Sequence, residues 1–268
     1  MRYIGIDLAW GSRNSTAVVA LRSAATGVEY FAHADALTDN ESIADFIGAC
    51  DDGGGILVAV DAPTLVPNDA GRRPCEAILS RCMRSYEAGP HPANRTLLSD
   101  ANGDVRGETL VTLLADRFEI IHTPNFVGDT SRAVFEAFPH PAHIALFDLP
   151  RTLKYKKKPG RDRASRDAEF RRYAALLAGL VGADPPLLAA PESMPWLWRD
   201  PSEFVSEAAL KRHEDLLDAL TCAYIAVYHD RWQGERSVVV GDLKSGYIVT
   251  PATEIMKSCF RAPLVAVQ

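Results

Sequence analysis

Hydrophobic residues in the first sixty positions occur in short runs that are typical of β-strands. The first run holds Tyr3, Ile4, Ile6 and Leu8, and further runs follow at 16–22 and 27–32. A fourth run, ILVAVDAP at 56–63, is wholly apolar until Asp61 and Pro63 end it. Such continuous apolar strands are typical of the centre of a sheet that is covered on both faces.

The rest of the chain predicts mainly helices. Helical patterns cover 40–49, 74–86, 107–121, 164–181 and 202–231. A short strand, AVFEAFPH at 133–140, and two β-like pieces, SVVV and GYIVT, complete the pattern. This order predicts an α/β fold with a mixed sheet and helices on its faces. Because no repeat or linker is visible, we expect a single domain over 1–268 with an insertion at about 64–130.

Composition and charge narrow the class of protein. Of the 268 residues, 47% are hydrophobic and 24% are charged, which is ordinary for a globular protein. The net charge of −6 argues against a surface that coats nucleic acid generally, although it allows a local basic patch. Neither a membrane-spanning apolar run nor a secretory signal is visible, so we expect no membrane partner and a cytoplasmic location. The five scattered cysteines form no CxxC pair, which predicts reduced thiols rather than disulfides or a zinc site.

Three apolar strands each carry one acidic residue: Asp7, Asp61 and Glu136. A buried carboxylate costs free energy unless it meets a cation, a hydrogen-bond donor or a water-filled cleft. Each acid alone is also compatible with a turn cap or a strand end. Three acids at corresponding places are harder to explain in that way, and we expect neighbouring strand ends to bring them together.

A fourth acid comes from the long helix. Asp215 and Asp218 are three residues apart and share a helix face, and Asp218 borders the most apolar turn. The alternative, a solvated acid favoured by the helix dipole, suits Glu207 better than Asp218. Gathered carboxylates raise each other's pKa unless a cation is present, and oxygen ligands favour Mg²⁺ or Mn²⁺. Two such ions about 3.5–4 Å apart can support phosphodiester hydrolysis.

Basic residues are concentrated in one loop, LKYKKKPGRDR at 153–163. Lys154, Lys156 and Lys157 are candidate phosphate contacts because the loop follows the strand that carries Glu136. A solvated surface loop is the alternative. Arg72 and Arg73 are further candidates for binding an anionic substrate, although packing or surface roles are equally open.

Four ordered motifs resemble the domain of unknown function 429 family, a group of predicted nucleases with a ribonuclease-H-like fold. The motifs are GIDLAWG at 5–11, VDAP at 60–63, EAFPH at 136–140 and DALTCAYIA at 218–226. The resemblance implies a mixed five-stranded sheet, with three antiparallel strands and then two parallel ones, and the insertion between the fourth and fifth. It also implies that Asp7, Asp61, Glu136 and Asp218 are catalytic carboxylates that hold Mg²⁺ or Mn²⁺, with Asp215 as a further ligand.

We therefore expect a metal-dependent nuclease that acts on a nucleic acid or nucleotide. A phosphotransferase or nucleotide-binding protein of the sugar-kinase and actin type is the first alternative. That class needs glycine-rich phosphate turns, whereas Asp7 precedes Leu-Ala-Trp and Asp61 precedes Ala-Pro. The second alternative is a non-catalytic nucleic-acid-binding module on the same fold, since fold alone does not establish function.

Overall fold

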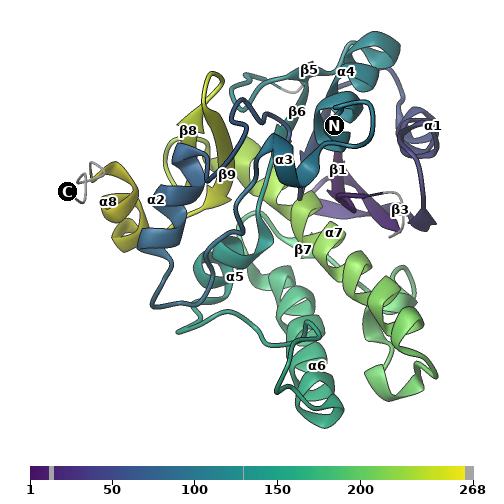
Figure 1. Cartoon of the computed structure of the whole chain (residues 1–268). Helices are drawn as coiled ribbons and strands as arrows, with labels where there is room; N and C mark the ends of the chain where they lie inside the picture. Colours follow the sequence, from purple (N-terminus) through teal and green to yellow (C-terminus); the bar gives the residue numbers. More distant parts are fainter. Residues whose placement is uncertain (12–14, 129, 263–268) are drawn as a thin grey trace.

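A seven-stranded sheet forms the centre of the protein (Figure 1), which we describe from a computed structural model over residues 1–11, 15–128 and 130–262. The strand order is β5-β6-β4-β1-β2-β3-β7. β1 pairs antiparallel with β2 and parallel with β4, β2 pairs antiparallel with β3, and β4 pairs parallel with β6. The strands are β1 Arg2–Asp7, β2 Thr16–Ala24, β3 Gly27–Leu37, β4 Ile56–Val60, β5 Ile121–His122, β6 Arg132–Glu136 and β7 Leu187–Leu188.

Helices cover both faces of this sheet. The long helix α7 (Glu207–Trp232), green in Figure 1, packs across β1, β2 and β4 on one face. Helices α1 (Asn40–Cys50) and α4 (Arg106–Phe118) enclose a second core on the other face. The strands alternate between the two cores, since Tyr3 lies in the α7 core while Ile4 and Ile6 lie in the other. Both predicted features, a mixed sheet and flanking helices, are confirmed.

Helix α7 and strand β1 touch through their backbones at Gly5. A Cβ atom at Gly5 would lie 2.0 Å from the carbonyl oxygen of Ala219 and 2.1 Å from the amide nitrogen of Ala223. Glycine on the strand and alanines on the helix therefore permit a contact that no larger side chain allows. Because side chains alternate along a strand, Asp7 lies on the same face of β1 as Gly5 and also faces α7. On α7, Asp215 lies one turn before Ala219, so Asp7 comes close to Asp215.

The segment between β4 and β6 holds α2 (Pro74–Cys82), α3 (Arg95–Leu98), α4 and β5. After β6 come α5 (Pro139–Phe147), α6 (Arg163–Gly179) and three short 3₁₀ turns, Leu180–Gly182, Pro195–Trp198 and Pro201–Glu203. A hairpin of β8 (Ser237–Asp242) and β9 (Gly246–Pro251) and the helix α8 (Glu254–Arg261) follow α7 and pack against α2 (Figure 1). The two predicted β-like pieces after the long helix are thus confirmed as β8 and β9.

Several predicted elements have different bounds in the structure, and two of these differences have a clear local cause. The strand expected over 133–140 ends at Glu136, and an unpredicted helix, α5, begins at Pro139. Proline is compatible with a first helical turn, where its missing N–H has no helical partner to lose. The long helix begins at Glu207 rather than 202, because the Ser206 side chain caps it by accepting a hydrogen bond from the amide of Ala209.

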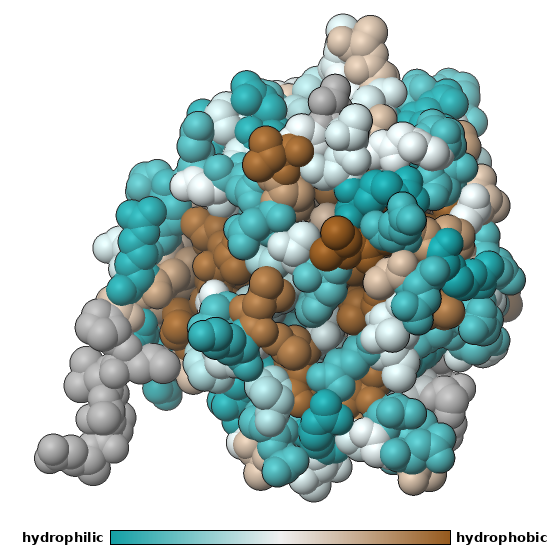
Figure 2. All heavy atoms as spheres, turned by 90° about the horizontal axis from the view of Figure 1, so that it is seen from above, coloured by the Kyte–Doolittle hydropathy of each residue, from teal (hydrophilic) through white to brown (hydrophobic). Residues whose placement is uncertain are grey.

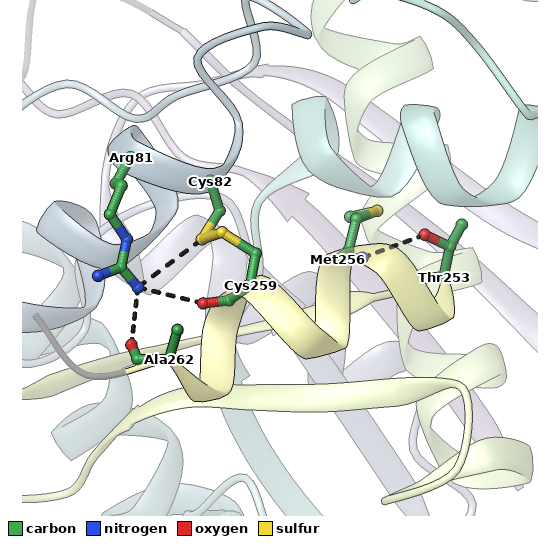
Figure 3. The surroundings of a disulfide bond; sticks show 6 residues. All are labelled: Arg81, Cys82, Thr253, Met256, Cys259 and Ala262. Atoms are coloured by element: carbon green, nitrogen blue, oxygen red, sulfur yellow. Dashed lines mark hydrogen bonds between the residues drawn. A yellow bond between two sulfur atoms is a disulfide. The ribbon is translucent and has the colours of Figure 1, made fainter.

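The expectation that all five cysteines are reduced is wrong. Cys82 and Cys259 form a disulfide across 177 residues of sequence, while Cys50, Cys75 and Cys222 are free and buried. Figure 3 shows the bond between the end of α2 and α8, where the Arg81 guanidinium donates to the carbonyls of Cys259 and Ala262. Sequence spacing does not reveal this pair because tertiary packing of α8 on α2 brings the sulfurs together. The cysteine argument for a reducing compartment therefore no longer holds.

Within the described ranges, the helices are too short or too polar to cross a bilayer. Figure 2 shows one face of the molecule, on which hydrophobic side chains appear in separate places among hydrophilic ones.

Substitution of Gly5 by Ala should lower the free energy of unfolding by about 3 kcal/mol or more, because the new Cβ would overlap the backbone of α7. Urea denaturation of the variant and wild type measures this loss. The control is Gly179→Ala, since a Cβ at Gly179 meets nothing within 4 Å. Equal stability of Gly5→Ala and Gly179→Ala would contradict the close contact.

Substitution of Cys259 by Ser should lower the free energy of unfolding by about 2–4 kcal/mol, because the 177-residue loop is no longer closed in the unfolded chain. Wild type with a reductant should unfold at the same denaturant concentration as the variant, and the variant should not respond to the reductant. A wild-type midpoint that is indifferent to reduction would contradict the disulfide.

Candidate active site

Four carboxylates meet where β1 and β4 end and α7 begins to cross the sheet. Asp7 is the last residue of β1, and Asp61 directly follows β4. The two strands run parallel, so their carboxyl ends share one edge, and the amide of Asp61 extends the pairing by donating to the Ile6 carbonyl at 2.8 Å. Asp215 and Asp218 come from α7, and both interact electrostatically with Asp7. We call Asp7, Asp61, Asp215 and Asp218 the acid cluster.

Asp218 is the member of the acid cluster with the most partners. Its side chain is fully buried, and its Oδ1 accepts hydrogen bonds from the hydroxyls of Tyr155 at 2.6 Å and Tyr173 at 3.1 Å. Its Oδ2 lies 2.8 Å from the Nζ of Lys156. Burial opposes ionisation of Asp218, but the charge and hydrogen bond of Lys156 together with the nearby His140 and His143 outweigh it and hold the pKa at about 2. Asp218 is therefore an ionised carboxylate in a buried ion pair.

Lys156 reaches into the acid cluster from the basic loop. Burial alone would lower the pKa of its ammonium, but Asp218, Asp7 and Asp61 together raise it well above the usual range. The preceding residue, Tyr155, is buried and carries the hydroxyl that binds Asp218. The loop is thus tied to the core at this point, and Lys156 is a fixed positive charge among carboxylates.

Asp7 and Asp61 lack such a partner. Burial and the neighbouring charges of Asp215 and Asp218 raise the pKa of Asp7 well above its usual range. The pKa of Asp61 is raised to about 7, mainly by burial, although Lys156 opposes the shift. Across the described chain, no lysine or arginine donates a hydrogen bond to either carboxylate. The negative charge of each ionised carboxylate is therefore not compensated by a directly bound basic side chain.

Asp215 has a basic partner on its own helix. The ammonium of Lys211 pairs with Asp215 and lies 3.0 Å from the Oε1 of Glu214. The Lys211 side chain is 56% exposed, so this pair lies at the outer side of the acid cluster. The i,i+3 and i,i+4 spacings of the three residues are visible in the sequence and could have predicted these pairs.

Glu136 lies at the same sheet edge but outside the acid cluster. Its Oε1 lies 2.6 Å from Nη2 of Arg73, and its Oε2 accepts from Nη1 of Arg73 at 2.8 Å and from the amide of Thr64 at 2.9 Å. In the alternation of β6, Glu136 points to the opposite side from Phe135, which lies in the α7 core. Asp215 thus lies with Asp7, whereas Glu136 is paired with Arg73 and still raises the pKa of Asp61 through its charge. The catalytic role expected for Glu136 stays a prediction.

Arg73, a candidate substrate contact, is buried and paired with acids in this structure. Its side chain is 1% exposed and pairs with both Glu76 and Glu136. Arg72 is exposed but donates to the hydroxyl of Ser80 and the carbonyl of Pro90, away from the acids. Both arginines stabilise the segment around α2 in this structure.

A cavity of about 460 Å³ opens beside the acid cluster, and Asp7 and Asp61 line it. Lys154 also lines the cavity and pairs with Glu87, whereas Lys157 is 72% exposed, lies near Glu207 and is not part of the lining. Several lining residues come from separate loops and carry no local pattern that predicts a site: Trp10, Glu87, Gly89 and His91. Other lining groups are Phe138, His140, Lys156, Lys158 and Arg161.

The acid cluster has the donor chemistry of a site for a hard divalent cation. All its ligating atoms are oxygens, which suit Mg²⁺ or Mn²⁺ better than zinc. In the arrangement described here, over residues 1–11, 15–128 and 130–262, no three His, Cys, Asp or Glu side chains form a ready metal site. The Lys156 ammonium lies among the carboxylates instead. The donors fit an ion in chemistry, with Asp7 and Asp61 as the residues that most need one.

One family comparison is informative. The profile of the family described as "Protein of unknown function (DUF429)" matches residues 5–244. The matched range contains the whole acid cluster and the basic loop. No curated protein matches the chain.

Substitution of Asp61 by Asn should stabilise the protein increasingly as the pH rises. The pKa of Asp61 is about 7 in the folded state and near its ordinary 3.8 in the unfolded state. The folded state therefore binds more protons between about pH 4 and 7, and wild-type stability falls as the pH rises through that window. Relative to wild type in EDTA, Asp61→Asn should gain on the order of 2–4 kcal/mol between pH 4 and 8.

Urea denaturation at a series of pH values measures this gain, with Asp69→Asn, an exposed acid outside the acid cluster, as the control. A stability difference between Asp61→Asn and wild type that does not change with pH would show that Asp61 ionises normally.

Proposed function

The chain belongs to the DUF429 family, and we propose that it is a nuclease that hydrolyses phosphodiester bonds with the help of Mg²⁺ or Mn²⁺. The observation that carries this proposal is a cavity that is lined both by Asp7 and Asp61 of the acid cluster and by basic side chains. Carboxylates bind the metal ions that activate water, while lysine and arginine attract phosphate. The substrate class is a nucleic acid or nucleotide.

We also propose a ribonuclease-H-like core for the sheet. Support comes from the five adjacent strands β3-β2-β1-β4-β6, in which the first three are antiparallel and β4 and β6 run parallel to β1. On this proposal β5 and β7, of two residues each, are additions at the two edges. The segment between β4 and β6 corresponds to the expected insertion.

The residues of the site would have separate roles in the reaction. Asp7 and Asp61, with Asp215 beside them, would hold the ion, which when bound supplies water activation and stabilises the leaving oxygen. Lys154, Lys158 and Arg161 on the cavity wall would hold the phosphates of the substrate. Arg73 and Glu136 would fix the turn after β4 through the amide of Thr64 and so keep Asp61 in place.

Substitution of Asp7 by Asn should abolish metal-dependent cleavage and most of the stabilisation by Mn²⁺, because an amide is a poor ligand and an ion stabilises a fold only through its affinity for it. In EDTA the variant should melt at the same or a higher temperature than wild type, since repulsion within the acid cluster is reduced. The measurements are cleavage of single-stranded, duplex, hybrid and branched substrates and melting curves in EDTA and Mn²⁺.

The control for both measurements is Asp69→Asn, which should behave as wild type. Nucleic-acid binding without cleavage in any metal would identify a binding module instead of an enzyme. An unchanged Mn²⁺-induced shift in Asp7→Asn would contradict the ligand role of Asp7.

A further inference from the structure

We infer that Lys156 is a built-in cation of the acid cluster, so that the cluster takes one divalent ion rather than two. This inference rests on the proposed metal dependence, and it assigns Lys156 a positioning role that differs from the phosphate contact expected from its place in a basic loop. Three observations support the inference: the contacts between Lys156 and Asp218, the access to each carboxylate, and the balance of charge in the site.

Both carboxylate oxygens of Asp218 already have a close partner. The hydroxyls of Tyr155 and Tyr173 donate to Oδ1, and the Lys156 ammonium lies 2.8 Å from Oδ2. An ion at Asp218 would have to displace one of these groups from a fully buried site. The Lys156 ammonium thus occupies the position beside Asp218 that a second metal ion would need.

The other three carboxylates remain accessible to an ion. Asp7 and Asp61 line the 460 Å³ cavity, and Asp7 and Asp215 line a second cavity of about 260 Å³. Asp218 lines neither of these two cavities. One or two carboxylates plus water suffice for Mg²⁺, so Asp7, Asp61 and Asp215 provide enough oxygen for a single ion.

The balance of charge also corresponds to one ion. Five carboxylates, the acid cluster and Glu214, face the two ammonium groups of Lys156 and Lys211. One divalent ion would reduce the remaining excess of negative charge from three to one. A second divalent ion would leave the buried site with a net positive charge, which is unfavourable.

The fold holds Lys156 in this position through the two residues that precede it in the loop. The Arg166 guanidinium donates to the Tyr155 carbonyl at 3.2 Å, and the Lys154 amide donates to the Glu169 carboxylate at 2.8 Å. Lys157, by contrast, is 72% exposed and lies near Glu207. The adjacent lysine is therefore a matched control of the same charge outside the acid cluster.

The test counts bound Mn²⁺ by equilibrium dialysis and follows melting temperature with and without Mn²⁺, so it does not depend on cleavage. Wild type, Lys156→Arg and Lys157→Met should each bind one ion. Lys156→Met should bind two, with the first bound roughly tenfold or more tightly, because a positive charge beside the ligands is gone. Lys156→Met should also melt lower than wild type in EDTA and gain more from Mn²⁺.

A double variant, Lys156→Met with Asp218→Asn, removes both charges of the pair and keeps the test valid if the single variant unfolds. It should bind one ion, as wild type does. Two ions in wild type, or the same number and affinity in wild type and Lys156→Met, would overturn the inference, as would the absence of Mn²⁺ binding in every variant. One bound ion without cleavage of any substrate would support the inference while refuting the nuclease proposal.

Discussion

The backbone contact between β1 and α7 at Gly5 determines the geometry of the site. A strand and a helix usually keep the distance that their side chains impose, but here a glycine faces Ala219 and Ala223 and the two backbones meet. Two residues further along β1, the same close approach brings Asp7 against the acids one turn earlier on α7. The carboxylates are therefore forced together by main-chain packing, and packing free energy offsets their mutual repulsion.

Buried negative charge is then the constraint that the rest of the site must satisfy. The fold compensates part of this charge with basic side chains that pair with individual acids: Lys156 with Asp218, Lys211 with Asp215, and Arg73 with Glu136. Asp7 and Asp61 are left without such a partner, and their raised pKa values reflect this. Basic side chains balance the charge of the other acids, whereas the two acids beside the cavity have no such partner. This arrangement is suited to bind a cation at the cavity.

Much of the fold and part of the site could be predicted from the sequence. The apolar strands that end in Asp7 and Asp61, and the i,i+3 pair of Asp215 and Asp218, are local patterns. Glu136 has the same local sequence pattern as Asp61, yet its side chain faces away from the α7 core and pairs with Arg73. Only the three-dimensional structure reveals this pairing. Lys156 resembles its neighbours in a basic run, because nothing local distinguishes an ammonium that turns inward from one in solvent. The disulfide between Cys82 and Cys259 likewise depends on long-range packing.

Anomalous diffraction from Mn²⁺-soaked crystals would show whether the acid cluster takes a single divalent ion beside a fixed lysine. We expect one Mn²⁺ peak within about 2.0–2.3 Å of oxygens of Asp7 and Asp61, with the Lys156 ammonium still on Asp218. Two peaks at the acid cluster, a peak bound to Asp218 in place of Lys156, or saturating Mn²⁺ with no peak at Asp7 and Asp61 would contradict this expectation.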